Sequence, residues 1–242
     1  MAQQANQPGV AMVVGVGPGL GAALVRRFAQ GGHAIAMVAR SHKFMDGLAA
    51  EIGTVGGRIL AVTADVGDAE QVGRAFDTVR AKLGTPEVLL YNAGSGKWGT
   101  ITEITPEQYE DSWRINAYGA FLCAKQAVPD MIAERRGVML FTGATAGVKA
   151  GPKSAAFGPA KFAVRGLAQS LARDLGPRGI HVAYVNVDGI IDIPHIRAQM
   201  PSLKDEDVLK PPAIAEAYWY LANQDPSAWT QELDVRPFKE KF

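Results

Sequence analysis

Short, nearly continuous apolar runs alternate along this chain with longer stretches whose hydrophobic residues recur at helical spacing. Runs that are apolar at almost every position are typical of strands covered on both faces, and such strands form parallel sheets. Glycine or Gly-Pro stops, as at Gly84 and Gly176, end most of the helical stretches. The pattern predicts strands at residues 10–16, 34–39, 59–63, 88–91, 138–142 and 181–187, and helices at residues 20–30, 44–52, 69–83, 106–135 and 160–175.

This order of elements predicts an α/β fold with a Rossmann-like, doubly wound parallel sheet and helices on both faces, giving three αβα layers. No internal repeat, low-complexity tract or linker interrupts the 242 residues, so we expect a single domain over residues 1–242. Residues 190–212 follow the last clear strand and are rich in proline and charge. We expect this segment to form a loop or lid.

Composition narrows the classes of partner that the chain is expected to bind. Hydrophobic residues make up 48% and charged residues 20%, and the formal net charge is +1 without a run of Lys or Arg. A nucleic-acid partner would need a broad basic face, so none is expected. The first eight residues lack the basic and apolar regions of a signal peptide, and no apolar run approaches membrane-spanning length. We therefore expect a cytoplasmic protein with no membrane partner.

Cys123 is the only cysteine, so the chain can form neither an internal disulfide nor a cysteine-based metal cage. It lies in an apolar helical stretch and is expected to be a core residue. The four histidines show no metal-ligand spacing, and no metal is expected.

A glycine-rich turn lies between the first predicted strand and the first predicted helix, and it contains Gly15, Gly17, Gly19, Leu20 and Gly21. Glycines let the backbone turn sharply and approach a pyrophosphate, whose charge the N–H groups and dipole of the new helix hold. The spacing differs from the common G-x-G-x-x-G fingerprint, and similar turns also occur without a ligand. Because strand, turn and helix follow in the required order, we interpret this turn as a nucleotide-binding site.

The residues after the next two predicted strands bear on which nucleotide binds. Arg40 stands where an NAD site carries an acidic residue for the ribose, and a guanidinium there can bind a 2′-phosphate bidentately. This favours NADP(H), with NADPH preferred over NADH, although Arg40 is also explained as a residue that solvates a strand end. Asp65 and Val66 are candidates to contact adenine, the alternative being that Asp65 is a helix N-cap.

The motifs described above and three later ones together make the chain resemble the short-chain dehydrogenase/reductase superfamily. The later motifs are Asn92-Ala93-Gly94 after the fourth predicted strand, Asn116, and Lys161 in Phe-x-x-x-Lys, and all motifs follow in family order from about residue 10 to 190. The resemblance implies that Asn92, Ala93 and Gly94 line the cofactor. It also implies that Asn116 positions a water in a proton relay and that Lys161 binds the nicotinamide ribose.

Two oxygen-bearing residues that the resemblance leads us to expect are absent. It places a catalytic tyrosine four residues before Lys161 and a serine thirteen residues before that tyrosine, and these positions hold Phe157 and Ala144. In the family the lysine lowers the pKa of the tyrosine, whereas a phenyl ring cannot donate a proton. The Pro-Gly step that shapes the nicotinamide pocket in relatives is also replaced, and the resemblance places Asp188 and Ile190 at the cofactor there.

A substitute proton donor would have to lie near the nicotinamide ring. The candidates are Thr145, Ser154, Asp188 and His195. Each also has a more ordinary explanation: Thr145 and Asp188 as turn residues, Ser154 as a helix N-cap, and His195 as a solvated loop residue. A substrate that needs no strong acid is a further alternative.

Two classes of function remain open at this point. The first is an NADP(H)-dependent oxidoreductase that transfers hydride to or from a small carbonyl or alcohol substrate by an altered proton-donor mechanism. The second is a catalytically silent NADP(H)-binding sensor or scaffold, which the two lost side chains favour.

The resemblance also implies an assembly. The helices at residues 106–135 and 160–175 would form the contact faces of a homodimer or homotetramer. We expect aromatic residues such as Trp113 and Phe121 to serve packing or subunit contact. Trp98 is better placed to reach a substrate, because its loop follows Asn92-Ala93-Gly94.

Overall fold

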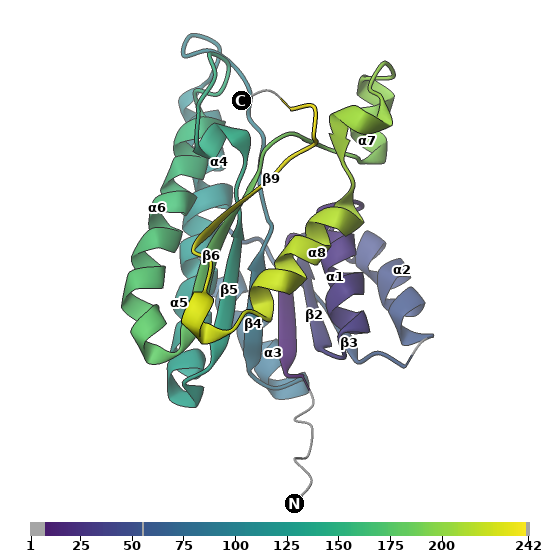
Figure 1. The fold of residues 1–242 in the computed structure, drawn as a ribbon, viewed down its shortest axis with the longest axis vertical. Helices are drawn as coiled ribbons and strands as arrows, with labels where there is room; N and C mark the ends of the chain where they lie inside the picture. The colour runs from purple at the N-terminus through teal and green to yellow at the C-terminus, as the bar shows by residue number, and fades with distance from the viewer. Residues whose placement is uncertain (1–7, 55, 241–242) are drawn as a thin grey trace, which may run out of the picture.

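A seven-stranded, wholly parallel sheet forms the centre of the molecule (Figure 1). The computed structural model describes residues 8–54 and 56–240, so the expectation about a signal peptide falls almost entirely outside the described residues. The strand order is β3-β2-β1-β4-β5-β6-β9, and the predicted fold class is confirmed. The strands are β1 (Val10–Val14), β2 (Ala34–Ala39), β3 (Ile59–Thr63), β4 (Pro86–Tyr91), β5 (Gly137–Thr142), β6 (Ile180–Val187) and β9 (Glu232–Val235).

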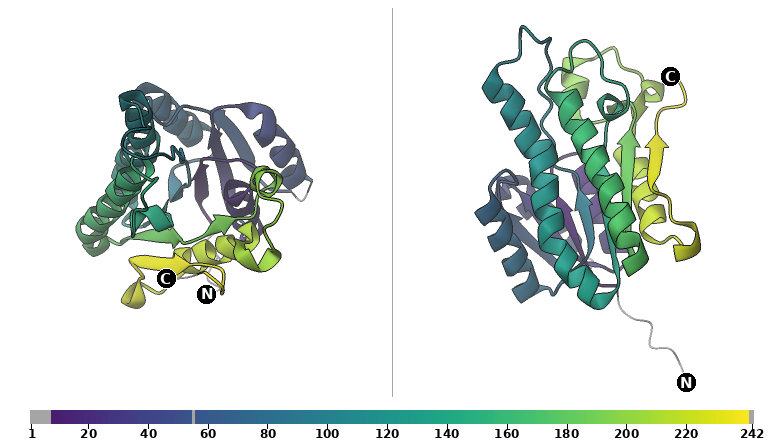
Figure 2. Two further views of the ribbon diagram at one scale, coloured as in Figure 1. Left: turned by 90° about the horizontal axis from the view of Figure 1, so that it is seen from above. Right: turned by 90° about the vertical axis from the view of Figure 1, so that its left-hand side faces the viewer.

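Helices cover both faces of the sheet (Figure 2). Each face has its own hydrophobic core. Successive side chains of β1 point to opposite faces, so Met12 and Val14 join one core and Ala11 and Val13 join the other. This explains why β1 is apolar at every position. The first face carries α3 (Ala69–Lys82), α5 (Gly119–Glu134) and α6 (Phe157–Leu175), and the second carries α1 (Leu20–Gln30), α2 (His42–Gly53) and α8 (Pro211–Ala222).

The predicted helix at residues 106–135 is interrupted in the structure. It consists of α4 (Pro106–Trp113), one π-helical turn (Arg114–Tyr118) and α5. Cys123 of α5 is buried in the core, as predicted. π-Helical turns often occur at functional sites, and this one carries Asn116.

Neither Asp65 nor Ser154, which the sequence offered as helix N-caps, holds that position, although α3 begins at the predicted residue Ala69. The N-cap of α3 is Asp68, whose side chain accepts hydrogen bonds from the N–H groups of Glu70 and Gln71, so Asp65 is not the N-cap. Helix α6 begins at Phe157, with Ala156 in the N-cap position, so Ser154 is not an N-cap either. The helix includes Pro159 because the N–H groups of a first helical turn need no intrahelical partner.

The C-terminal part contains two elements that the pattern did not predict, α8 and β9. Helix α8 begins at two consecutive prolines, which resemble a loop in sequence but are tolerated in a first helical turn. Strand β9 has the sequence Glu-Leu-Asp-Val, in which charged and apolar residues alternate, because the strand lies at the sheet edge beside β6. The segment expected as a loop or lid is also partly regular. It contains β7 (Ile190–Ile191), α7 (Pro194–Gln199) and β8 (Val208–Leu209).

The order of the strands reverses beside β1, because β1 pairs with β2 on one side and with β4 on the other. Crossovers on the two sides of such a point lead to opposite faces and leave a crevice outside the carboxyl ends of the strands. The glycine-rich turn after β1 and the segment after β4 both begin at this crevice. The topology thus determines where the candidate site lies.

Candidate functional site

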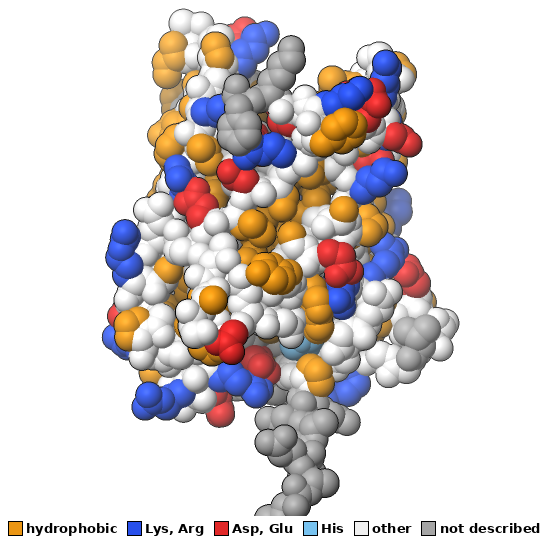
Figure 3. Space-filling model, viewed as in Figure 1, with side chains coloured by type: hydrophobic (Ala, Val, Ile, Leu, Met, Phe, Trp, Pro, Cys, Tyr) orange, Lys and Arg blue, Asp and Glu red, His pale blue; other side chains and the backbone are white. Residues whose placement is uncertain are grey.

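A cavity of about 600 Å³ lies at the carboxyl ends of β1, β4, β5 and β6. At this end the surface is notched between the side that carries α7 and the side that carries α4 (Figure 3). The walls of the cavity come from the glycine-rich turn, the segments after β4 and β5, the start of α6 and the lid segment. The predicted residues that line it are Gly15, Gly17, Gly19, Leu20, Gly21, Asn92, Gly94, Trp98, Ala144, Thr145, Phe157, Lys161 and Ile190.

The glycine-rich turn is packed so closely that two of its glycines cannot be replaced without a shift of backbone. Gly15 has φ +94°, and a Cβ there would lie within 2.5 Å of the Ala93 Cα. A Cβ on Gly21 would lie 2.5 Å from the carbonyl oxygen of Gly15. In contrast, a Cβ on Gly17 would meet nothing within 4 Å among the described atoms. Open space over Gly17, beside the N-terminus of α1, fits a pyrophosphate.

A neighbouring cavity of about 520 Å³ extends from the same turn toward the ends of β2 and β3. It shares Gly15, Gly17, Asn92 and Gly94 with the first cavity, and its other walls include the predicted residues Arg40, Asp65, Val66 and Ala93. The two cavities therefore join across the glycine-rich turn. A dinucleotide, with its pyrophosphate over the turn and one nucleoside on each side, fits this shape.

Arg40 and Asp65 differ in how they are held. Arg40 is exposed at the end of β2 and makes no hydrogen bond or ion pair within the part of the chain that the structure describes. The Asp65 side chain accepts a hydrogen bond from the Gly67 N–H at 2.8 Å, which closes a turn before α3. The guanidinium of Arg40 is thus available to a ligand, whereas one Asp65 oxygen is already used.

Asn92 joins β4 to the glycine-rich turn and to β5. Its Nδ2 donates to the carbonyl oxygen of Gly15 at 2.9 Å, and its Oδ1 accepts from the Thr142 Oγ1 at 3.2 Å. The Thr142 hydroxyl is also 2.7 Å from the hydroxyl of Tyr218, which is fully buried on α8. The network holds three neighbouring strand ends in register. The roles of Thr142 and Tyr218 were missed because neither residue belongs to a motif.

Lys161 and Asn116 converge beside Gly94. A Cβ on Gly94 would lie 3.2 Å from the Asn116 Oδ1 and 3.6 Å from the Lys161 Nζ. The Asn116 Nδ2 donates to the carbonyl oxygens of Ser95 at 3.0 Å and Ser112 at 2.8 Å. Its Oδ1 is buried and has no hydrogen-bond partner among the described residues. An unpaired buried acceptor is costly, so this oxygen is a natural site for a bound water.

The Lys161 ammonium is held in an apolar environment. Its Nζ donates to the carbonyl oxygen of Thr142 at 2.9 Å, and the side chain is 5% exposed. Burial disfavours the charged form and lowers the pKa of Lys161 to about 8. Among the residues that line the 600 Å³ cavity, Lys161 is the only one with an ionisable side chain.

Phe157 and Ala144 lie in the same cavity as Lys161. The Lys161 Nζ is 5.6 Å from the centroid of the Phe157 ring, one helical turn away. The Phe157 ring packs against Trp98, with centroids 4.9 Å apart at a tilt of 49°. Trp98 is 62% exposed and lines the cavity.

Beneath Ala144 lies Tyr184, a residue that the sequence did not point to. The Ala144 N–H is 3.4 Å from the Tyr184 hydroxyl oxygen, which accepts it, and the ring fills the space under Gly143 and Gly147. Burial raises the pKa of Tyr184 to about 12, so it stays a neutral phenol. Tyr184 does not line the cavity and supports the loop from below.

The four candidate proton donors are not brought together. Only Thr145 lines the cavity. The Ser154 Oγ is buried and donates to the carbonyl oxygen of Gly151 at 2.7 Å. Asp188 is buried and lies 3.7 Å from the Arg236 Nε, and His195 is exposed on α7. The structure therefore places three of the four away from the open volume of the site.

The lid segment packs isoleucines onto the cavity. Ile190, Ile191, Ile193 and Ile196 all line it, and the Ile193 Cγ2 lies 2.6 Å from where a Cβ of Gly19 would stand. Arg197 holds the segment together. Its guanidinium donates two hydrogen bonds to Asp192, one to Asp205 and one to the carbonyl oxygen of Leu203, at 2.7–3.0 Å.

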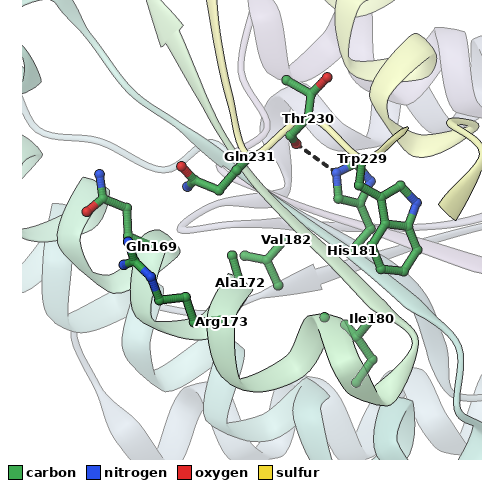
Figure 4. Close-up of a pocket in the computed structure, with 10 residues that line it drawn as sticks. Gln169, Ala172, Arg173, Ile180, His181, Val182, Trp229, Thr230 and Gln231 are labelled. Carbon is green, nitrogen blue, oxygen red and sulfur yellow. Dashed lines mark hydrogen bonds between the residues drawn. The ribbon is translucent and has the colours of Figure 1, made fainter. Parts of the chain in front are cut away.

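A further cavity, of about 390 Å³, lies at the amino end of β6, away from the predicted site residues (Figure 4). There the His181 and Trp229 rings stack at 4.9 Å with an interplanar angle of 3°. The His181 Nε2 is 2.8 Å from the carbonyl oxygen of Thr230, and burial lowers the pKa of the ring. A neutral, stacked histidine of this kind joins β6 to the segment before β9 and carries no obvious chemistry.

No cluster of three His, Cys, Asp or Glu side chains within residues 8–54 and 56–240 could hold a metal ion. In the same ranges, no helix has the length and apolar character needed to cross a bilayer.

Comparison with known proteins shows the family and supports the fold. The family model for short chain dehydrogenases matches residues 9–200. A probable tetrahydroxynaphthalene reductase of Zymoseptoria tritici is 30% identical over 238 residues, covering 89% of this chain and 88% of the relative. A short-chain dehydrogenase from Rhodopseudomonas palustris has TM-score 0.83 and 33% identity, covering 95% of this chain and 99% of that one.

A metagenomic short-chain oxidoreductase solved in complex with NADP is also similar. It has TM-score 0.83 and 26% identity, and the match covers 95% of this chain and 96% of that one. With the family model spanning most of the described sheet and site, the chain belongs to the short-chain dehydrogenase/reductase family.

Proposed function

We propose that the protein is an NADP(H)-dependent oxidoreductase that reduces the carbonyl group of a small, mainly apolar substrate, or oxidises the corresponding alcohol, by an altered proton-donor mechanism. One observation carries the proposal. Two cavities joined across a glycine turn end beside Lys161, the one ionisable side chain that lines the reacting end.

The cofactor would be held mainly by backbone. Gly17, Gly19, Leu20 and the first turn of α1 are suited to the pyrophosphate, and Asn92 fixes the turn by its bond to Gly15. Bound NADPH would supply the hydride. The free guanidinium of Arg40 and the NADP bound by the metagenomic relative support NADP(H) over NAD(H).

The remaining predicted cofactor contacts follow from the same placement. Asp65, Val66 and Ala93 line the cavity expected for the adenosine, and Gly94 and Ile190 line the one expected for the nicotinamide. Asp188 lines neither cavity, so we propose that it acts through its ion pair with Arg236 and not by direct contact.

The walls of the reacting end favour an uncharged, apolar substrate. Trp98 and Phe157 form one wall and four isoleucines of the lid form another, with no carboxylate or guanidinium among the lining residues. Charged substrates would lose hydration there without a partner, apart from Lys161. The tetrahydroxynaphthalene reductase named above acts on an aromatic compound, so bicyclic aromatic ketones belong in the substrate panel.

The reaction lacks the family's usual acid, and this has a measurable cost. Hydride transfer to a carbonyl leaves charge on oxygen, and a positioned acid contributes about 10²–10⁴ in rate. Phe157 cannot supply that proton, and Ala144 cannot hydrogen-bond the carbonyl oxygen. The proposed enzyme is therefore slow, or it uses another donor.

A second candidate function is a silent NADP(H)-binding sensor or scaffold. The paired absence of oxygen at Phe157 and Ala144 favours it. Absorbance at the NADPH band, followed with a broad panel of aldehydes, ketones and quinones, separates the two. Turnover above a no-enzyme control supports the oxidoreductase, and tight NADPH binding without any turnover supports the sensor.

We propose in addition that the protein forms a homodimer or homotetramer through α5 and α6, which run side by side on one outer face (Figure 2). Trp113, Tyr118 and Phe121 stack there with centroid distances of 5.5 and 6.3 Å. Trp113, Phe121 and Phe162 are each more than 40% exposed. Light scattering of the wild type and of Phe121→Lys tests this, with a shift to monomer expected for the variant.

A further inference from the structure

We infer that the Lys161 ammonium is itself the proton donor to the substrate oxygen, taking over the part that a phenol plays elsewhere in the family. The inference rests on the proposed reductase function. It assigns Lys161 a second task beside the cofactor contact that the family resemblance implies.

The cavity offers few groups that could donate a proton. Of the four donors considered from sequence, Ser154, Asp188 and His195 lie outside the lining, and the hydroxyl of Thr145 is a very weak acid. Lys161 is the only lining residue with a proton of suitable acidity.

The Lys161 ammonium also lies close to the space beside the Phe157 ring. A phenyl ring is shorter than a phenol by one oxygen atom, so Phe157 leaves room next to its edge. The Lys161 Nζ lies one helical turn away, 5.6 Å from the ring centroid. A substrate oxygen in that room would approach the ammonium directly, without an intervening hydroxyl.

The Lys161 ammonium has N–H bonds that its one hydrogen bond does not use. It carries three N–H bonds, and one of them is used by the Thr142 carbonyl oxygen at 2.9 Å. No ion pair holds Lys161 among the described residues. A second N–H can therefore point into the cavity.

The groups that face Lys161 from the packed elements are almost all neutral. They are the Thr142 carbonyl of β5, the amide of Asn116, and Phe157 of α6 itself. Tyr184 of β6 approaches through Gly147 and is the one titratable group among them, with its pKa raised to about 12. Burial therefore decides the acidity of Lys161 and brings its pKa to about 8, a suitable value for an acid at neutral pH.

In the proposed reduction, bound NADPH would supply a hydride for the new C–H bond on the substrate carbon and would leave as NADP⁺, while the π electrons of the C=O bond move to oxygen. One N–H bond of Lys161 breaks, its proton forms the new O–H bond, and the electron pair stays on Nζ. The neutral amine then regains a proton from solvent, for which the unpaired Asn116 Oδ1 beside Gly94 offers a water site.

The decisive experiment is chemical rescue. Lys161→Gly should lower kcat with saturating NADPH by about 10²–10⁴-fold. Methylamine or ethylamine should restore part of the rate, whereas tetramethylammonium, which has the charge but no proton, should not. Lys161→Arg should lose a similar factor, because a guanidinium does not release its proton. Lys153→Arg, an exposed lysine outside the cavity, is the control and should keep the wild-type rate.

A readout without turnover keeps the inference testable if these variants fold poorly. NMR of wild-type protein with ¹³C-labelled lysine side chains should show one lysine that titrates near pH 8, and kcat should fall as pH rises through the same value. A Lys161 that titrates with the other lysines, near 10.4, would overturn the inference.

The outcomes separate the two proposals. If Lys161→Arg keeps the wild-type turnover and the wild-type pH profile, Lys161 is not the proton donor, and the proposed reductase function is unaffected. If the wild-type protein binds NADPH and reduces no compound in the panel, both the reductase function and the role of Lys161 as proton donor are contradicted.

Discussion

The two joined cavities have an end proposed for the cofactor's phosphates and an end proposed for the reaction, and these ends are built from different parts of the protein. The phosphate end is made of backbone, with Gly15 and Gly21 packed so tightly that no side chain fits. The reacting end is made of side chains, and it holds a phenyl ring and a methyl group at the positions where the family resemblance implies two hydroxyls. A backbone cradle does not depend on the side chains of Ala144 and Phe157, so we expect cofactor binding to persist although both hydroxyls are absent.

The largest effect is expected at the phosphate end. Gly15→Ala places a Cβ at φ +94° and within 2.5 Å of the Ala93 backbone. We expect a loss of about 2–4 kcal/mol in the free energy of unfolding and no measurable NADPH binding. Denaturant unfolding and calorimetry measure the two quantities.

Gly17→Ala is the matched variant, because its Cβ meets open space. It should keep the wild-type stability and still weaken NADPH binding, since the methyl group enters the space proposed for the pyrophosphate. Wild-type affinity in this variant would show that the phosphate lies elsewhere.

At the reacting end, Ala144→Ser combined with Phe157→Tyr restores both hydroxyls. If the remaining geometry is competent, kcat should rise by about 10²-fold, the lower end of the usual contribution of a positioned acid. Steady-state kinetics with saturating NADPH measure it. No gain in the double variant would mean that the substrate binds in a different position from that in relatives.

The buried ammonium of Lys161 should also make the free energy of unfolding depend on pH. Burial lowers the pKa of Lys161 to about 8, below its unfolded value, so between about 8 and 10.5 the unfolded chain binds more protons than the folded one. Wild-type stability therefore rises with pH across that window. Lys161→Met, which has no such proton, should be more stable than wild type by about 1–3 kcal/mol at pH 7, and the gap should close toward pH 10.

Thermal unfolding at several pH values measures the gap. Lys153→Met is the control, because Lys153 is exposed. A Lys161→Met gap that stays constant from pH 7 to 10 would contradict the assignment of a lowered pKa.

A smaller effect is expected on the choice of cofactor. Arg40→Asp replaces a free guanidinium with a carboxylate that repels a 2′-phosphate, so the ratio of NADPH to NADH affinity should fall at least about tenfold. Arg173→Asp, an exposed change far from the turn, should leave the ratio unchanged. Equal ratios in both variants would remove Arg40 from the cofactor site.

The smallest effect belongs to Ser154→Ala. This hydroxyl bonds the Gly151 carbonyl and does not reach the cavity, so the variant should lose about 1 kcal/mol of stability and keep its kcat. A large loss of kcat would return Ser154 to the list of proton donors.

The sequence predicted the fold well where strands are buried on both faces. Strand β1 is apolar at all positions because helices cover it on both sides, and this pattern is unambiguous. Strand β9 was missed because an edge strand alternates, and Glu-Leu-Asp-Val resembles a loop. Helix α8 was missed because its first residues are prolines.

The candidate site could be predicted where its residues belong to motifs. It could not be predicted where residues outside the motifs support them. Gly15, Asn116 and Lys161 stand at recognisable spacings. Tyr184 of β6 and Tyr218 of α8 contact residues of the site only because of tertiary packing. The spacing of residues along the sequence does not predict such contacts. Ser154 illustrates the reverse error, since a suitable residue near a helix start proved to be buried against Gly151.

Calorimetric titration of the unmodified protein with NADPH and NADH tests the central claim most directly, because the cofactor cradle underlies every later step. The account predicts saturable heat with NADPH, weaker binding of NADH, and a loss of that preference in Arg40→Asp. Absence of heat with either coenzyme, in protein that is shown to be folded, would contradict it.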